Sequence, residues 1–508
     1  MRFKRSAGIL VHPTSLPGSY GIGELGKEAF AFIDLLVECG QSLWQILPLG
    51  PTGYGDSPYA CFSALAGNPL LIGLDQLVEE GDVDPEDLAQ ASEFPVDRVD
   101  FGPVISFKYA ILRRAARTFR ETADQTRRAA FDRFCRENAD WLDDFALFMA
   151  LKDAHGGAVW NTWERGLVLR QPDVMEAWRE RLDESVFAQH YYQFQFFKQW
   201  EALKAYANDN GIQIVGDIPI FVAYDSVDVW AHPEVFYLDE DLLPTEVAGV
   251  PPDYFSPTGQ LWGNPLYRWD AMAEGGYTWW VRRFSQTLAT VDIVRLDHFR
   301  GFAAYWAVPA GEPTAINGEW RKGPSVGFFT AIRDALGELP IIAEDLGHIT
   351  DDVLELREAF SLPGMNVLQF AFASDAGNPY LPHNLRNNSV IYTGTHDNDT
   401  TMGWYATREG SELENCLEYI GPTDEPINWA LIRLAYRSVA DLAITPLQDV
   451  LGLGTEARMN TPGKFGNNWS WRFALEDVKP FHRERLNAMA LAYGRKDPEK
   501  KQERPKWM

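Results

Sequence analysis

Cysteine is scarce in this 508-residue sequence, which contains only four. They are spread along the chain without a CxxC pair, at Cys39, Cys61, Cys135 and Cys416. Isolated cysteines of this kind are more typical of reduced structural thiols than of a disulfide framework or a zinc site. We therefore expect the protein to work in a reducing compartment, the cytoplasm.

Long hydrophobic runs are also missing. No stretch of about 18 consecutive apolar residues occurs, which is the length that suggests a membrane-spanning helix. The amino terminus, MRFKRSAGIL, lacks the long apolar segment of a secretory signal. Both absences predict a cytoplasmic protein without a membrane partner.

Basic residues are few relative to acidic ones, 46 against 72, and the formal net charge is −26. Nucleic acid is not expected as a partner, because the neutralisation of phosphates requires basic surfaces. Aromatic residues are plentiful by contrast, at 13% of the chain. Most of them must belong to the core, but flat rings also stack on the apolar faces of sugars, so a neutral sugar ligand is compatible with this composition.

Short apolar segments alternate with amphipathic helical patterns along the chain. The predicted strands are 7–13, 42–49, 212–222, 292–301, 340–347, 366–372, 390–395 and 443–449. Helical patterns at 28–39, 277–289, 326–336, 351–360 and 427–440 separate most of them. Such alternation indicates parallel strands joined by helices. Because a minimal (β/α)8 barrel needs about 250 residues, we predict an α/β fold, one TIM barrel enlarged by insertions.

A single catalytic barrel is predicted over residues 1–500, with two insertions. Residues 56–184, after the second strand, form a mainly helical insertion, and residues 229–275, after the third strand, form an insertion with an active-site loop. Helical patterns of the first insertion and of the return to the barrel lie at 103–120, 127–151 and 185–208. Within the second insertion, 250–265 is predicted to be a long irregular loop, and such loops are usually functional. Residues 495–508 form a charged tail that we expect to be frayed.

Charged side chains stand where several predicted strands end. These residues are Asp217, Arg295, Asp297, His298, Glu344, His396 and Asp397. The ends of several different parallel strands supply the catalytic residues of TIM-barrel enzymes. The sequence therefore predicts one active site at this end of the barrel.

Two of these carboxyl groups have surroundings that favour opposite protonation states. Alternation along a strand places Arg295 and Asp297 on one face, opposite Leu296 and His298, and the Arg side chain stabilises a charged carboxylate. Glu344 follows the apolar segment Pro-Ile-Ile-Ala, a setting that raises the pKa of a carboxyl group. Retaining cleavage of a glycosidic bond uses one ionised nucleophile and one protonated acid, so this pair fits that chemistry.

Five motifs together resemble the amylomaltase (4-α-glucanotransferase, disproportionating enzyme) family, over residues 7 to about 480. In chain order they are GYGDSPY (53–59), PPDYFSPTGQLWGNP (251–265), RLDHFRGF (295–302), AEDLG (343–347) and THDNDT (395–400). The resemblance implies that Asp297 is the nucleophile, Glu344 the acid/base and Asp397 the third carboxylate. It also implies transfer of α-1,4-glucan segments from a donor to a sugar acceptor through a covalent glucosyl-Asp intermediate. The related α-amylases carry a His near the third-strand Asp, and its absence around Asp217 favours a transferase.

A further set of residues is predicted to bind the substrate, as polar donors and acceptors or as stacking surfaces. These are Tyr59, Asp217, Tyr254, Trp262, Arg295, His298, His396 and Asn467. The aromatic loop 250–265 is predicted to exclude water and to hold the acceptor sugar. No metal and no organic cofactor are expected, because two carboxyl groups suffice for this reaction.

Three alternatives stay open on the residues alone. A retaining hydrolase like α-amylase would use the same carboxyl groups. A metal-dependent barrel hydrolase could take ligands from Asp297-His298 and His396-Asp397, although Arg295 would repel a divalent cation. A non-enzymic glucan-binding protein would not need both Asp297 and Glu344. The sequence does not define the donor length or the oligomeric state.

Overall fold

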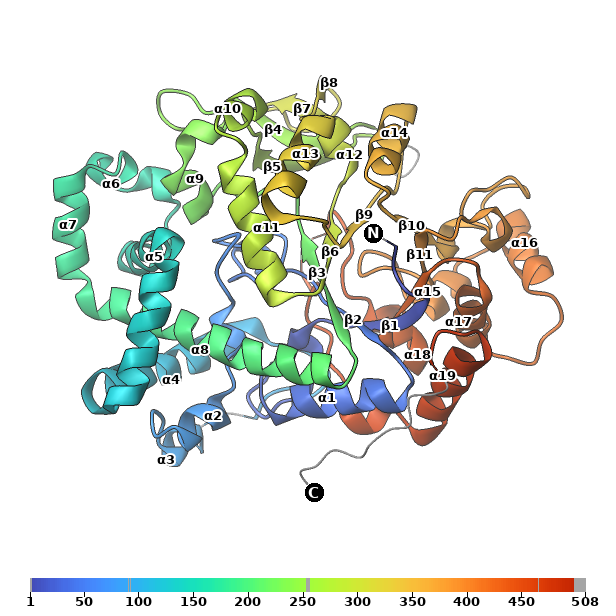
Figure 1. Ribbon diagram of the computed structural model, residues 1–508, viewed down its shortest axis with the longest axis horizontal. Helices are drawn as coiled ribbons and strands as arrows, with labels where there is room; N and C mark the ends of the chain where they lie inside the picture. Colours follow the sequence, from blue (N-terminus) through green and yellow to red (C-terminus); the bar gives the residue numbers. More distant parts are fainter. Residues whose placement is uncertain (1, 90, 92, 253–255, 465, 498–508) are drawn as a thin grey trace.

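The computed structural model describes residues 2–89, 91, 93–252, 256–464 and 466–497. Eight parallel strands form a closed barrel in the order β1-β12-β11-β10-β9-β6-β3-β2, with helices packed around it (Figure 1). The barrel strands are β1 (Ser6–Leu10), β2 (Leu43–Gln45), β3 (Gln213–Ile218), β6 (Ile293–Leu296), β9 (Ile341–Ala343), β10 (Gly364–Val367), β11 (Ser389–Tyr392) and β12 (Leu442–Pro446). The predicted TIM barrel is therefore confirmed.

Each barrel strand is shorter than the apolar segment that predicted it. Residues 447–449, predicted as strand, begin helix α18 (Leu447–Leu451), and residues 368–370 form a 3-10 helix directly after β10. Both predictions were wrong at their carboxyl ends, because a short apolar run reads the same for a buried strand and for a buried helical turn. The side chains of these turns are mostly buried, as those of a strand would be.

Helices surround the barrel and fill the first insertion. They are α1 (Lys27–Glu38), α2 (Leu74–Glu79), α3 (Pro85–Leu88), α4 (Phe101–Thr122), α5 (Gln125–Ala154), α6 (Arg165–Val168), α7 (Pro172–Arg181), α8 (Asp183–Asp209), α9 (Val227–Ala231), α10 (Trp269–Glu274), α11 (Thr278–Thr290), α12 (Arg300–Ala303), α13 (Ser325–Leu336), α14 (Asp351–Ala359), α15 (Thr401–Ala406), α16 (Gly410–Ile420), α17 (Ile427–Arg437), α18 and α19 (Pro480–Ala492).

The three long helices α4, α5 and α8 account for part of the aromatic content. The ring of Phe119 on α4 lies 5.1 Å from Tyr191 and 6.1 Å from Phe194 on α8, centroid to centroid. Trp141 on α5 lies 5.9 Å from Phe197 on α8, centroid to centroid. These rings form a core between the helices, and α8 then leads back to the barrel at β3 (Figure 1).

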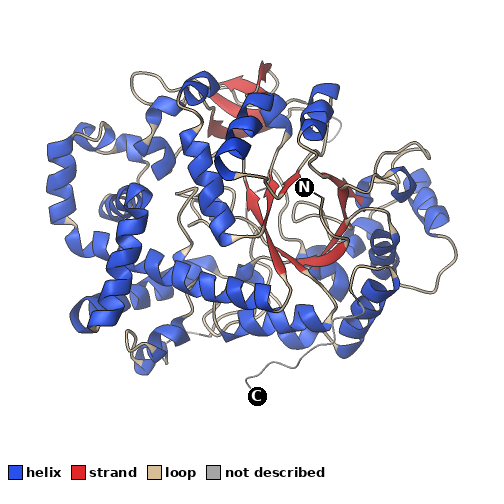
Figure 2. Cartoon of the chain, in the orientation of Figure 1, coloured by secondary structure: helices blue, strands red, loops and turns tan. Residues whose placement is uncertain are grey.

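A second, antiparallel sheet lies beside the barrel (Figure 2), in the order β5-β4-β7-β8. Its strands are β4 (Glu246–Val250), β5 (Gln260–Pro265), β7 (Ala304–Pro309) and β8 (Glu319–Lys322). The prediction of an irregular loop over 250–265 was wrong for 260–265, which pairs with β4. The composition of residues 260–265 is not typical of a strand. On its other side, β4 pairs with β7, which comes from a distant part of the chain. Tyr254 and Phe255 lie outside the described residues.

The carboxyl-terminal part is held more firmly than predicted. Arg495, at the start of the predicted frayed tail, is 2% exposed and donates hydrogen bonds to the carbonyl oxygens of Ser6 and Tyr436. Residues 498–508 lie outside the described ranges. None of the described helices is long and apolar enough to cross a membrane.

Candidate active site

Strand register brings the predicted catalytic pair together. Asp217 pairs with Arg295 across β3 and β6, and Leu296 pairs with Ala343 across β6 and β9. Asp297 directly follows Leu296, the last residue of β6, and Glu344 directly follows Ala343, the last residue of the adjacent strand β9. The Glu344 amide donates to the carbonyl oxygen of Leu296 at 3.1 Å, which continues the ladder up to the acidic residues.

The guanidinium of Arg295 lies between two carboxylates. Its Nη1 donates to both oxygens of Asp217, at 2.9 and 2.7 Å, and to Oδ1 of Asp297 at 2.8 Å. The side chains of Asp217 and Arg295 are 0% and 5% exposed, whereas that of Asp297 is 27% exposed. Burial raises the pKa of Asp217 to about 7, and the Arg295 charge opposes this increase. The same guanidinium bonds to Asp297, which is partly open to solvent.

Among the described residues, backbone amides rather than a cation bond to Glu344. Its Oε2 accepts the His298 amide at 2.7 Å, and its Oε1 accepts the Leu346 amide at 3.3 Å. Burial raises the pKa of Glu344 to about 8, and the negative charge of Asp297 adds to the increase, while the more distant Arg295 charge opposes it. A carboxyl group with this pKa is mostly protonated at neutral pH, as a general acid must be.

The chain turns sharply after Asp297. His298 has a positive φ of 52°, so the strand alternation that predicted its side-chain direction ends here. This turn points the His298 amide at Glu344 and places its ring 4.8 Å from the Trp262 ring, at 84°. Burial lowers the pKa of His298 to about 4, so the imidazole is neutral at physiological pH. Trp262, on β5, is 39% exposed beside this turn.

Asp397 and His396 follow β11 on another side of the barrel mouth. Asn460 donates to Asp397 Oδ1 at 2.6 Å, and His396 Nε2 lies 3.4 Å from Asp397 Oδ2. Burial lowers the pKa of His396, whose Nδ1 has no hydrogen-bond partner among the described residues. Tyr59, in the loop after β2, stacks on His396 with ring centroids 5.1 Å apart.

Tyr59 also connects the two halves of the site. Its hydroxyl donates to Asp217 Oδ2 at 2.7 Å, while its ring contacts His396 and lies 5.8 Å from Trp469. Burial and the neighbouring Asp217 charge raise the pKa of Tyr59 well above its usual range, so the hydroxyl keeps its proton. The residue therefore ties the loop after β2 to both β3 and β11.

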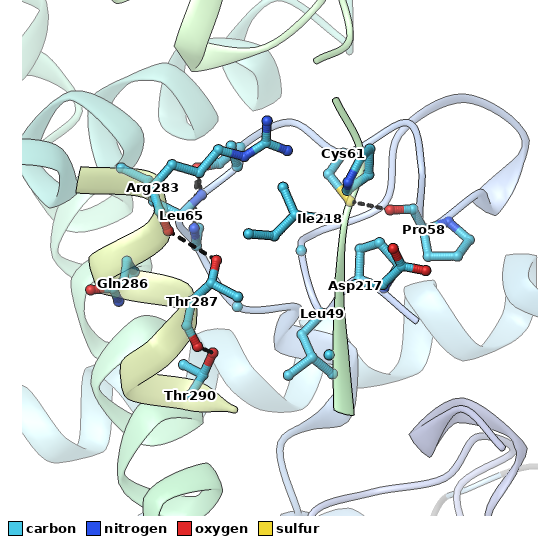
Figure 3. A pocket seen from close by; sticks show the side chains of 18 of the residues that line it. Leu49, Pro58, Cys61, Leu65, Asp217, Ile218, Arg283, Gln286, Thr287 and Thr290 are labelled. Atoms are coloured by element: carbon cyan, nitrogen blue, oxygen red, sulfur yellow. Dashed lines mark hydrogen bonds between the residues drawn. The ribbon is translucent and has the colours of Figure 1, made fainter. Parts of the chain in front are cut away.

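A cavity lies next to Tyr59 and Asp217, between the barrel and α11 (Figure 3). Thr287 and Thr290 of α11 line one side of it, and Cys61 lines another, with its thiol donating to the carbonyl oxygen of Pro58. Burial raises the pKa of Cys61 to about 12, so this thiol is not a nucleophile at neutral pH. Apolar side chains make up most of the cavity wall, while Tyr59 and Asp217 of the carboxylate site also line it.

The remaining predicted binding residues are less closely associated with these groups. Asn467 is exposed, and its backbone oxygen accepts a bond from Ser470 at 3.4 Å. Tyr254 lies outside the described residues. Within the described ranges, no group of three or more His, Cys, Asp or Glu side chains has the arrangement of a metal site.

Sequence reasoning missed the two residues that hold Asp397. Arg458 and Asn460 lie in an irregular segment after α18. The Arg458 side chain donates to the backbone carbonyl oxygen of Asp397 at 2.6 Å, and the Asn460 side chain donates to the Asp397 carboxylate. No periodicity or motif marks this segment in the sequence. Only the tertiary fold brings it to the end of β11.

Comparisons with known proteins identify the family of the chain. A family model described as 4-alpha-glucanotransferase, glycoside hydrolase family 77, matches residues 11–476. The chain is 52% identical over 497 residues to a 4-alpha-glucanotransferase of Synechocystis sp., covering 97% of this chain and 98% of the relative. It is also 52% identical over 500 residues to that of Thermus thermophilus, covering 97% and 99%.

A solved structure extends this likeness to the fold. The amylomaltase from Streptococcus agalactiae, in complex with acarbose, superimposes with a TM-score of 0.94 at 40% identity, covering 97% of this chain and 100% of that one. Identity and coverage of this order leave no large part of the barrel or its insertions without a counterpart. The chain belongs to the 4-alpha-glucanotransferase family.

Proposed function

We propose that this enzyme moves α-1,4-glucan segments between malto-oligosaccharides or starch-like glucans by a retaining double displacement. The acceptor is glucose or another glucan. The observation that carries the proposal is the contrast between adjacent carboxyl groups. Asp297 is bonded to the Arg295 guanidinium, whereas Glu344 is bonded to backbone amides and has a pKa raised to about 8.

In the first step, Asp297 attacks the anomeric carbon of the donor sugar. The bond from that carbon to the glycosidic oxygen breaks, and a bond to the Asp297 carboxylate oxygen forms. The proton of Glu344 passes to the departing oxygen, so the leaving glucan ends in a neutral hydroxyl group. The products of this step are a covalent glucosyl-Asp297 and an ionised Glu344.

In the second step, an acceptor hydroxyl replaces the bond to Asp297. Glu344 takes the proton of that hydroxyl, and the two inversions at the same carbon together retain its configuration. Water and sugar compete at this stage, so transfer requires a surface that holds the sugar and limits water. We assign part of that surface to Trp262, which is 39% exposed beside His298.

The other predicted residues have supporting roles in this proposal. Asp397 accepts hydrogen bonds from sugar hydroxyls and helps to distort the ring. The subsites are lined or shaped by Tyr59, Asp217, Arg295, His298, His396 and Asn467, whereas Tyr254, also predicted to bind the substrate, lies outside the described residues. No step requires a metal or an organic cofactor, and Arg295 places a cation where a metal would otherwise compensate the carboxylates. The four cysteines are all free, which supports the proposed cytoplasmic location.

Incubation with maltotriose tests the activity. A transferase converts it into a ladder of longer and shorter oligosaccharides together with glucose, and the total number of reducing ends stays constant. Asp297→Asn is expected to abolish the ladder. A rise in reducing ends without longer products would instead favour the hydrolase alternative.

A further inference from the structure

The loop that carries Asp397 is fixed at both ends by one buried side chain. Asp449, on α18, is 1% exposed and accepts the hydroxyl of Thr393 at 2.5 Å, at the start of the loop. It also accepts the amide and the hydroxyl of Thr401, at 2.6 and 2.8 Å, at the end of the loop. The ends of the segment 393–401 are therefore held independently of any substrate.

The middle of this loop is held by the segment after α18. The backbone N–H of Asn460 donates to the carbonyl oxygen of His396 at 3.1 Å. The Arg458 side chain donates to the carbonyl oxygens of Asp397 and Asn460, at 2.6 and 2.7 Å. Arg458 thus ties the two backbones together. The Asn460 side chain, in contrast to these backbone contacts, donates to the carboxylate of Asp397.

The two oxygens of Asp397 are held differently. Oδ1 accepts a short hydrogen bond of 2.6 Å from the Asn460 amide, whereas Oδ2 has the His396 ring nitrogen at 3.4 Å. The Asp397 side chain is 46% exposed. Asn460 occupies one oxygen and so fixes the rotation of the carboxylate, while the other oxygen is left for a ligand.

We propose that Asn460 is a positioning residue for the transfer reaction, acting through Asp397. Its amide group orients Asp397 so that Oδ2 accepts hydrogen bonds from sugar hydroxyls, and Arg458 in turn holds Asn460. This inference rests on the proposed role of Asp397, and it adds a residue whose contribution is orientation rather than contact with the reacting atoms. Orientation of a pre-formed acceptor matters most in the transition state, where ring distortion strengthens the bonds to the sugar.

The variant Asn460→Asp gives a readout that a merely structural role would not produce. It keeps the size of the side chain but replaces the donor by a carboxylate facing Asp397. The other titratable groups that face Asp397 are His396 on the same loop, Tyr59 from the loop after β2 and Arg458. Two carboxyl groups at hydrogen-bond distance share one proton, so a donor is restored when the pH is lowered.

We expect kcat of Asn460→Asp for maltotriose to fall at least about tenfold at pH 7, with KM changed by less than about threefold. The deficit relative to the unmodified enzyme should shrink as the pH is lowered towards about 5, because the shared proton again donates to Asp397. Asn460→Ala should lose as much activity at pH 7 but show no recovery at lower pH. A pH-independent deficit in Asn460→Asp would overturn the proposal.

Asn468→Asp is the matched control. Asn468 lies in the same segment, and its side chain bonds to the Thr461 amide and the Lys464 carbonyl oxygen rather than to Asp397. The same change of charge there should leave the pH dependence of kcat as in the unmodified enzyme. If Asn468→Asp shifts it equally, the effect belongs to loosening of the segment, and the proposal fails.

A double-mutant cycle with Asp397→Asn separates this inference from the proposed function. If Asp397→Asn is nearly inactive and Asn460→Asp lowers its residual rate no further, both are supported. If Asp397→Asn is nearly inactive but Asn460→Asp and Asn460→Ala keep full activity, the positioning role alone fails. If Asp397→Asn keeps full activity, the proposed role of Asp397 fails, and with it the role of Asn460.

Discussion

The ends of β6 and β9 are neighbours in the barrel, yet they provide their carboxyl groups with opposite surroundings. At the end of β6, Asp297 is bonded to the guanidinium of Arg295, which also holds the buried Asp217. At the end of β9, Glu344 is bonded to two backbone amides and has a raised pKa because of burial. The difference teaches that two carboxyl groups at equivalent strand ends acquire different surroundings from their bonding partners, and in the proposed mechanism this contrast separates the nucleophile from the acid.

The largest expected effect comes from removing the cation that makes the two ends different. Arg295→Gln leaves Asp217 buried without its cation and leaves Asp297 with a neutral neighbour, much like Glu344. We expect kcat/KM for maltotriose to fall by at least about a hundredfold, as the loss of preorganised charge at an active site commonly does. Steady-state kinetics on variants with native circular dichroism measure this.

Arg357→Gln is the control for that variant. Arg357 pairs with Asp345, the residue directly after Glu344, and among the described residues its partners do not include Asp297 or Glu344. The Arg357→Gln variant therefore removes an Arg–Asp pair near the same strand ends without changing the different surroundings of Asp297 and Glu344. An equal loss of kcat/KM in both variants would show that any disturbance of these strand ends lowers activity, and that the Arg295 charge has no special role.

The pH dependence is the next largest effect. Glu344 must be protonated to act as the acid, and its pKa of about 8 lies above the usual range. The rate of the first step on maltotriose should therefore be full below about pH 7 and fall about tenfold per pH unit well above pH 8. A donor with a fluoride leaving group needs no proton in the first step, so its glycosylation rate should lack this decrease. The same alkaline decrease with both donors would exclude Glu344 as its source.

A smaller effect is expected from Trp262, whose ring lies against His298 between the ends of β6 and β9. Trp262 packs against His298, whose backbone amide bonds to Glu344, and the Trp262 side chain is 39% exposed. Trp262→Ala should raise the ratio of hydrolysis to transfer by about threefold to tenfold, while the first step changes less, because an aromatic contact contributes about 1 kcal/mol. Glucose release compared with longer products measures the ratio. An unchanged ratio would remove this face from acceptor choice.

Metal removal should have the smallest effect. Arg295 supplies positive charge between the acidic residues, so we expect full activity on maltotriose after dialysis against excess chelator. Loss of activity that calcium restores would contradict this expectation.

Much of the barrel, and the positions of the candidate site residues at its strand ends, could be predicted from sequence for a physical reason. Buried parallel strands are short apolar runs, and Asp297, Glu344 and Asp397 each follow such a run closely, so the pattern predicts both the strand and the position of the acid. Arg295 and Asp297, two residues apart, share a face as expected.

Features that depend on contacts between distant segments were not predictable. The second sheet depends on the pairing of β4 with β7, which places Glu246 opposite Pro309. No local pattern in residues 260–265 indicates that they form a strand. Asn460 reaches Asp397 across 63 residues of sequence, from a segment without periodicity. The assignment of residues 447–449 as strand failed because local composition does not distinguish a buried strand from a buried helical turn in so short a run.

Trapping the covalent intermediate tests the central claim most directly. Glu344→Gln cannot activate the acceptor, but a maltotriosyl fluoride donor does not need the acid, so the first step should proceed and the second should be slow. Mass spectrometry of the digested protein should then show one maltotriosyl unit on the peptide that contains Asp297, and Asp297→Asn/Glu344→Gln should show none. An adduct on Asp217 or Asp397, or release of a product with inverted configuration and no adduct, would contradict the assignment of Asp297 as nucleophile and Glu344 as acid/base.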